Sequence, residues 1–183
     1  MKRYQIDLTD RSAYLDDILN CCQVVGTKLA TGVGVRVGGS AKRGNISRYK
    51  YINTKKVLLE RSLKASIDRF TQSMNLKSNV ITHNILHFEP GHFLDWQDYY
   101  MWKKNFQLVG SMAIIGPVIK FFSIALTTGN NIEFKDREYD VDKHHGIVFE
   151  LSDVHRVLPV QMDQYWLVLG VAKHIDIISQ INC

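Results

Sequence analysis

The stretch that decides the fold is "GNNIEFKDREYDVDKHHGIVFELSDVHRVLPV", residues 129–160. It contains short segments of alternating or β-branched residues, separated by polar turn sequences such as "DVDKHHG". From about residue 79 onward the chain holds roughly eight such segments, whereas residues 10–25 and 56–74 place apolar residues at helical spacing. Many short strands at regular spacing predict a sandwich or a barrel.

We therefore predict an α+β protein, mainly β, forming a single domain over residues 1–183. Residues 1–78 are expected to give helical support with a basic loop, and residues 79–183 a strand core. The longest apolar stretch, "GSMAIIGPVIKFFSIAL", is interrupted by Gly116, Pro117 and Lys120, which favours core strands over a membrane span. The N-terminal sequence is charged and the three cysteines have no framework spacing, so we expect a cytoplasmic protein.

Three elements follow one another inside the quoted stretch. They are Asn130–Phe134, then Gly146 with Phe149 three residues later, then "HRVLPV" at 155–160. Their order and spacing resemble the closing half of the double-stranded β-helix of 2-oxoglutarate- and iron(II)-dependent oxygenases. This resemblance implies a jelly-roll, cupin-like barrel supported by the two N-terminal helices. It also implies His155 at the position of a metal-binding histidine, with Fe(II) and 2-oxoglutarate as the family's cofactors.

The opening half of the family's motif falls on "FEPGHFLDWQDYY", residues 88–100, and departs from it. The alignment places Gln97 and Tyr99 where the family has its metal-binding histidine and aspartate. Tyr165, preceded by Gln164, stands where the family has the arginine that grips 2-oxoglutarate. A single imidazole among neutral groups does not make the usual set of two histidines and a carboxylate. We therefore expect no metal and no cosubstrate, with Tyr99 and Tyr165 filling a former pocket around His155.

Two alternatives remain open at this stage. A β-bulge that shifts side chains by one position would turn Asp98 inward, and Asp98 and His87 would then join His155 in a rearranged Fe(II) site. Otherwise, the barrel is a metal-independent enzyme or binds a small ligand such as a sugar or nucleotide between Tyr99, Tyr165 and Trp166.

Positive charge is concentrated in one region. Residues 18–59 contain eight lysines and arginines and no acidic residue, so with a net charge of +5 for the chain the remainder carries −3. Aromatic residues lie among these charges in "RYKY", residues 48–51. This composition suits an acidic protein surface or an anionic ligand, and it also suits nucleic acid. A solvated face is the alternative. The predicted partner-binding residues are Lys42, Arg43, Arg48, Tyr49, Lys50, Tyr51, Lys55 and Lys56.

The sequence thus predicts a catalytically inactive oxygenase-like protein that acts as a binding, regulatory or inhibitory module. The basic segment or the mouth of the former active site would contact the partner. The competing hypothesis is an active 2-oxoglutarate- and Fe(II)-dependent dioxygenase, a hydroxylase, with a rearranged metal site.

Overall fold

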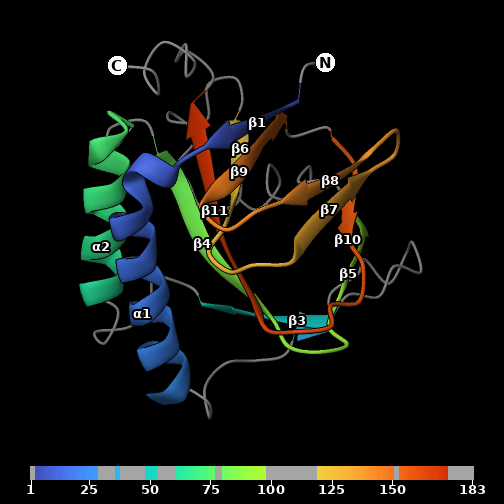
Figure 1. Cartoon of the computed structure of the whole chain (residues 1–183), viewed down its shortest axis with the longest axis horizontal. Helices are drawn as coiled ribbons and strands as arrows, with labels where there is room; N and C mark the ends of the chain where they lie inside the picture. The colour runs from blue at the N-terminus through green and yellow to red at the C-terminus, as the bar shows by residue number, and fades with distance from the viewer. Residues whose placement is uncertain are drawn as a thin grey trace, which may run out of the picture.

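A computed structural model describes residues 3–28, 36–37, 48–52, 61–76, 80–97, 119–150 and 153–172. Two helices lie against one face of a pair of antiparallel sheets (Figure 1). The helices are α1 (Ser12–Lys28) and α2 (Arg61–Ser73), and a short 3-10 helix, Thr9–Arg11, precedes α1. The strands are β1 (Tyr4–Asp7), β2 (Arg36–Val37), β3 (Arg48–Ile52), β4 (Val80–Phe88), β5 (Leu94–Gln97), β6 (Ile119–Ala125), β7 (Asn130–Phe134), β8 (Glu138–Val141), β9 (His145–Glu150), β10 (His155–Val157) and β11 (Gln164–Ala172).

The strand order confirms the predicted double-stranded β-helix. One sheet has the order β1-β9-β6-β11-β4-β3-β2 and the other the order β5-β10-β7-β8. From β4 to β11 the chain passes back and forth between the two sheets, with β7 and β8 forming a hairpin in the smaller one. This winding brings the inner faces of the two sheets together, as in a jelly roll.

The helices pack on the outer face of the seven-stranded sheet. Helix α2 buries Leu63, Ile67 and Phe70, which recur at helical spacing, and Met74 directly after the helix joins the same cluster. Helix α1 contributes its own buried apolar stripe to the same cluster, and the sheet supplies alternate residues of β4, β6 and β11. Both predicted helices are therefore confirmed as a support layer.

A second apolar cluster fills the space between the two sheets. It contains the residues that alternate with those facing the helices, such as Phe121 of β6 and Trp166 of β11. Phe149 lies at its centre, with its ring 5.9 Å from that of Phe121 and 5.4 Å from that of Phe134. This interior is where the family resemblance places a catalytic site.

Three strands of the large sheet, β1, β2 and β3, come from residues 1–78, the region predicted to be helix and loop. Strand β1 pairs with β9, with Tyr4 opposite Val148, and strand β3 pairs with β4. The basic loop expected within residues 1–78 is therefore partly strand, because β3 extends the sheet and also pairs with β2. No helix in the part of the chain that the structure describes is long and apolar enough to cross a membrane.

Candidate functional site

A small cavity lies between the two sheets beside His155. Its volume is about 10 Å³, close to the space that one water molecule needs. Three of its lining residues carry polar groups. These are the imidazole of His155, the hydroxyl of Ser123 and the indole N–H of Trp166. The rest of the wall is apolar and consists of Leu86, Phe88, Leu94, Ile132, Val157 and Val168.

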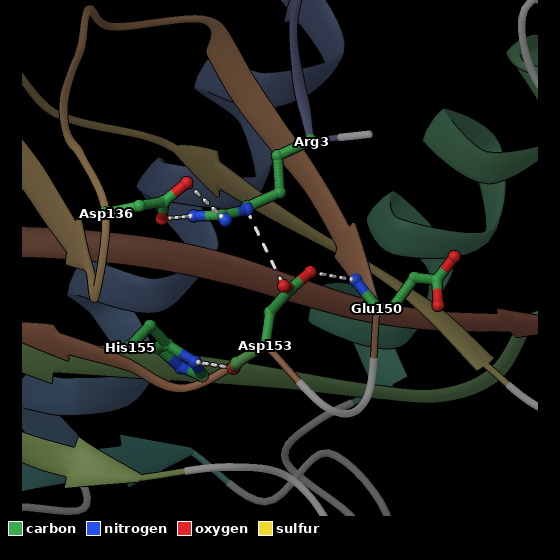
Figure 2. A network of polar contacts seen from close by, with 5 residues as sticks. All are labelled: Arg3, Asp136, Glu150, Asp153 and His155. Carbon is green, nitrogen blue, oxygen red and sulfur yellow. Dashed lines mark hydrogen bonds and ion pairs between the residues drawn. The ribbon is translucent and has the colours of Figure 1, made fainter. Parts of the chain in front are cut away.

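His155 is buried at the start of β10, with 1% of its surface exposed. Its Nδ1 atom lies 3.0 Å from the backbone carbonyl oxygen of Asp153, so Nδ1 carries the proton and donates it (Figure 2). The ring packs against Phe149 and Phe134, at centroid distances of 4.9 and 5.8 Å. The backbone bond and the aromatic neighbours together fix the orientation of the imidazole.

The register between β5 and β10 contains a β-bulge. His155 lies opposite Gln97 and Val157 lies opposite Leu94, so one residue of β10 faces two residues of β5. The bulge lies between Leu94 and Gln97, and after it the backbone of Gln97 is the ladder partner of His155. Asp98 and Tyr99 lie outside the described residues, so the alternatives that involve them stay predictions.

Tyr165 and His87 lie on the face of the large sheet that is turned towards the helices. They are opposite each other in the β11–β4 ladder, and their rings stack at 4.1 Å. Tyr165 packs against the helix-side cluster, and burial beside Cys22 and Asp163 raises its pKa to about 12. The His87 Nε2 atom lies 3.2 Å from a carboxylate oxygen of Asp163.

This arrangement corrects two expectations. Tyr165 does not fill a pocket around His155, and His87 is not placed to join His155 in a rearranged metal site. The reason is the alternation of side chains in a strand: the neighbours of Tyr165, namely Gln164 and Trp166, occupy the inner face instead.

Gln164 and Trp166 place polar groups inside the barrel. Gln164 Nε2 donates to the carbonyl oxygen of Gly129 at 2.7 Å. Its Oε1 atom, and the Nε1 atom of Trp166, are buried without a hydrogen-bond partner among the described residues. Strand β11 has no arginine, so its inner face offers no guanidinium to a carboxylate.

Comparison with known proteins shows the fold of this chain, but finds no match by sequence. No protein-family model matches the chain, and no curated protein matches its sequence. Among solved structures, a Pseudomonas putida prolyl-4-hydroxylase is similar with a TM-score of 0.56 and 12% identity, over 93% of this chain and 92% of that one. The chain has the fold of the 2-oxoglutarate- and iron(II)-dependent oxygenases.

Two further oxygenase-fold structures agree. A 2-oxoglutarate–Fe(II) oxygenase-family oxidoreductase from Burkholderia pseudomallei has a TM-score of 0.52 and 12% identity, over 95% of this chain and 94% of that one. The non-haem α-ketoglutarate-dependent epimerase SnoN of nogalamycin biosynthesis has a TM-score of 0.59 and 8% identity, over 93% of this chain and 77% of that one. These likenesses show the fold, and the chemistry has to be judged from the residues.

The described residues supply one of the family's metal ligands, and the expectation of no metal and no cosubstrate stays a prediction because the Gln97 side chain, Asp98 and Tyr99 lie outside them. Iron of this class needs two imidazoles and a carboxylate, whereas the cavity wall offers one imidazole and one hydroxyl. Within the described ranges no group of three His, Cys, Asp or Glu side chains is close enough to hold a metal ion. A dicarboxylate in the described cavity, which has a volume of about 10 Å³, would meet mainly apolar side chains.

A network of charged groups holds the backbone next to His155, and no pattern in the sequence indicates it (Figure 2). Arg3 binds the Asp136 carboxylate through two hydrogen bonds of 2.6 and 2.8 Å, and its Nε atom lies 3.5 Å from Asp153. The other oxygen of Asp153 accepts a hydrogen bond of 2.9 Å from the backbone N–H of Glu150. We call these four residues together with His155 the Arg3 network.

The Arg3 network also has an electrostatic and an aromatic component. The Arg3 guanidinium lies 4.5 Å from the centre of the Phe134 ring, which packs against His155. Partial burial opposes the charge on Arg3, but the hydrogen bond to Asp136 and the charge of Asp153 raise its pKa. The same hydrogen bond from Arg3 lowers the pKa of Asp136. The signal available in the sequence, a lone arginine before "YQID", is too common to be informative.

The basic segment can be placed only at the backbone level. Residues 48–51 form part of β3, and Lys50 is the ladder partner of His87. The side chains of β3 are not described, and Lys42, Arg43, Lys55 and Lys56 lie outside the described residues. The predicted partner-binding surface therefore stays a prediction.

Proposed function

We propose that this protein is a catalytically inactive oxygenase-fold protein that acts as a binding or regulatory module. The observation that carries the proposal is the wall of the cavity at His155, where one imidazole lies among mainly apolar side chains in a space for about one water molecule. A preserved barrel whose described interior is largely apolar supports a role as a scaffold. Its surface, rather than its centre, would then contact the partner.

The surface that we propose for this contact is the basic segment. Eight positive charges and no acidic residue over residues 18–59 favour an acidic protein surface or an anionic ligand as the partner. Because long-range attraction between exposed charges is screened by salt, such binding should weaken as ionic strength rises.

Metal analysis of the purified protein tests the proposal that it lacks a functional metal site. After incubation with Fe(II) or Mn(II) and removal of the excess, we expect less than stoichiometric metal, and no rise in melting temperature on adding metal with 2-oxoglutarate. His155→Ala serves as the reference for any metal bound elsewhere. Stoichiometric metal that is lost in His155→Ala would contradict the proposal.

A second candidate function is favoured by one observation. His155 donates from Nδ1 to a backbone carbonyl, the arrangement that orients many metal-bound histidines and leaves Nε2 as the ligand atom. An active oxygenase with a rearranged site would use O₂ to convert 2-oxoglutarate to succinate and CO₂. That turnover would disappear in His155→Ala and persist in His87→Ala, because His87 lies on the opposite face of the sheet.

Binding of two polyanions tests the partner. The probes are a poly-glutamate peptide and a single-stranded oligonucleotide of similar charge, measured at low and at physiological salt. Charge reversal by Arg48→Glu and Lys50→Glu should weaken binding of the preferred probe at least tenfold, while Lys64→Glu on helix α2 should not. If the charge-reversed variant binds the probe as well as the natural chain does, the basic segment is a solvated face that does not contact the partner.

A further inference from the structure

His155 is held inside the barrel by one backbone acceptor and two aromatic rings. Its Nδ1 atom donates to the carbonyl oxygen of Asp153 at 3.0 Å, so in the neutral ring the proton is on Nδ1 and Nε2 is the acceptor. The ring lies 4.9 Å from that of Phe149 and 5.8 Å from that of Phe134. Because the hydrogen bond of one ring nitrogen sets the tautomer, these contacts favour one tautomer and one orientation of the imidazole.

Arg3 supports two of these three contacts (Figure 2). Its Nε atom lies 3.5 Å from one carboxylate oxygen of Asp153, and the backbone N–H of Glu150 donates to the other oxygen at 2.9 Å. The residue whose carbonyl binds His155 is therefore held at its side chain from two directions. The Arg3 guanidinium also lies 4.5 Å from the centre of the Phe134 ring, where a cation is attracted to the aromatic face.

The N-terminal strand fixes Arg3 in turn. Arg3 binds Asp136, in the turn between β7 and β8, through hydrogen bonds of 2.6 and 2.8 Å, and such a two-point contact restricts the guanidinium. Strand β1 begins at the next residue and pairs with β9. Gln5 of the same strand donates to the backbone carbonyl oxygen of Asp140, on β8, at 2.6 Å. The place of β1 in the sheet thus decides where the Arg3 side chain lies.

We propose that Arg3 is a positioning residue for His155, through which the N-terminal strand controls the tautomer and the orientation of this buried imidazole. If β1 leaves β9, Arg3 leaves with it, and the supports at Asp153 and Phe134 loosen together. A partner that displaces β1 would then change the barrel interior without entering it. This role is separate from the binding function proposed for the basic segment and does not depend on it.

The tautomer of His155 can be read from its two ring nitrogens in a long-range nitrogen–proton correlation spectrum. The spectrum is recorded at pH 8, where an ordinary imidazole is neutral, and the signals are assigned by their loss in His155→Ala. In the natural chain we expect a single tautomer with the proton on Nδ1. In Arg3→Gln we expect the second tautomer to appear, and the Nδ1 proton to exchange with solvent about tenfold faster or more.

Two further variants separate this role from a general loosening of the strand. Gln5→Ala removes a contact of β1 with β8 that lies outside the Arg3 network, so it should leave the signals of His155 unchanged. Asp153→Asn keeps an oxygen for the Glu150 N–H but removes the charge that Arg3 contacts. It should therefore release the imidazole as Arg3→Gln does, and it tests the role even if Arg3→Gln does not fold.

Circular dichroism establishes that each variant is folded before its spectrum is compared. The proposal is overturned if folded Arg3→Gln and Asp153→Asn keep the single tautomer with unchanged proton exchange. It is also overturned if Gln5→Ala alters His155 as much as Arg3→Gln does, because the effect would then belong to the strand and not to the arginine.

Discussion

Gln164 and Tyr165 are neighbours in the chain but lie on opposite faces of β11, and this difference is not visible in the sequence. In "QYWLVLGVA" nearly every residue is apolar, because the strand is covered by helices on one face and by the second sheet on the other. Alternation of apolar and polar residues, which normally reveals the inner face, is absent. The family motif suggested that β11 contributes to the site, whereas only the ladder register shows which of its residues do so.

Asp153 is the buried carboxylate of the Arg3 network. Asp153→Ala removes the acceptor for the Glu150 N–H and the nearby charge for Arg3, so we expect it to lower the free energy of unfolding by about 2–3 kcal/mol. Urea denaturation measures the change. Asp136→Ala is the matched control, because Asp136 binds the same arginine with a side chain that is 64% exposed, and we expect a clearly smaller effect. Equal losses would show that burial does not distinguish the two carboxylates.

Strand β1 was missed because it is short and its partner is distant. It has four residues, and Tyr4 pairs with Val148. The alternation of Tyr4 and Ile6 is too brief to distinguish a strand from an extended N-terminal segment. The two helices, in contrast, carry several turns of apolar spacing, and their positions could be read from the sequence alone.

The contacts of Arg3 should protect strand β1 from local unfolding. Arg3→Ala removes both hydrogen bonds to Asp136 and the contact with Asp153, so we expect faster amide hydrogen exchange in β1 and at the paired end of β9. Exchange in α2 should not change. Arg156→Ala is the control, because Arg156 also binds a carboxylate, that of Glu133, yet lies away from β1. Unchanged exchange in β1 would contradict the inference.

The turn before β9 contacts Asp16 of helix α1 through Lys143 and His144, and we expect this contact to be lost in acid. Partial burial favours protonated Asp16, but hydrogen bonds from Lys143 and His144, each 2.8 Å, outweigh it and lower the pKa of Asp16. Because the unfolded chain has the higher pKa, about 3.9, this contribution to stability is complete above that value and is lost as pH falls through the folded pKa. Melting temperatures between pH 6 and 3 should show a shallower fall in Asp16→Asn.

The whole molecule has three layers, with the seven-stranded sheet in the middle. Its two faces carry the two apolar clusters, so neither cluster can lose its packing without exposing the central sheet (Figure 1). The sequence predicted these layers, because helical and strand periodicities are local patterns and the order of the motif elements fixed the barrel type. The site was less predictable, since it depends on which residues distant strands bring together.

Cooperative unfolding follows from the shared sheet. Phe70→Ala on the helix side and Phe149→Ala between the sheets each remove a fully buried ring, and each should cost about 3–5 kcal/mol. In both variants the helical circular dichroism and the tryptophan fluorescence should be lost in a single coincident transition. A helix signal that disappears at lower denaturant concentration in Phe70→Ala would show instead that the helices unfold on their own.

The pairing of β1 with β9 has a consequence for the order of events on the ribosome. Tyr4 is synthesised more than a hundred residues before its ladder partner, Val148. At about 5–20 residues per second, the N-terminal strand waits on the order of ten seconds before it can pair. Until then Arg3 has neither of its carboxylates, and strand β1 has no partner strand and is open to pairing with other chains. Strand β1 is therefore made long before it can be fixed in the sheet, and this interval during synthesis is when it is most exposed to misassembly.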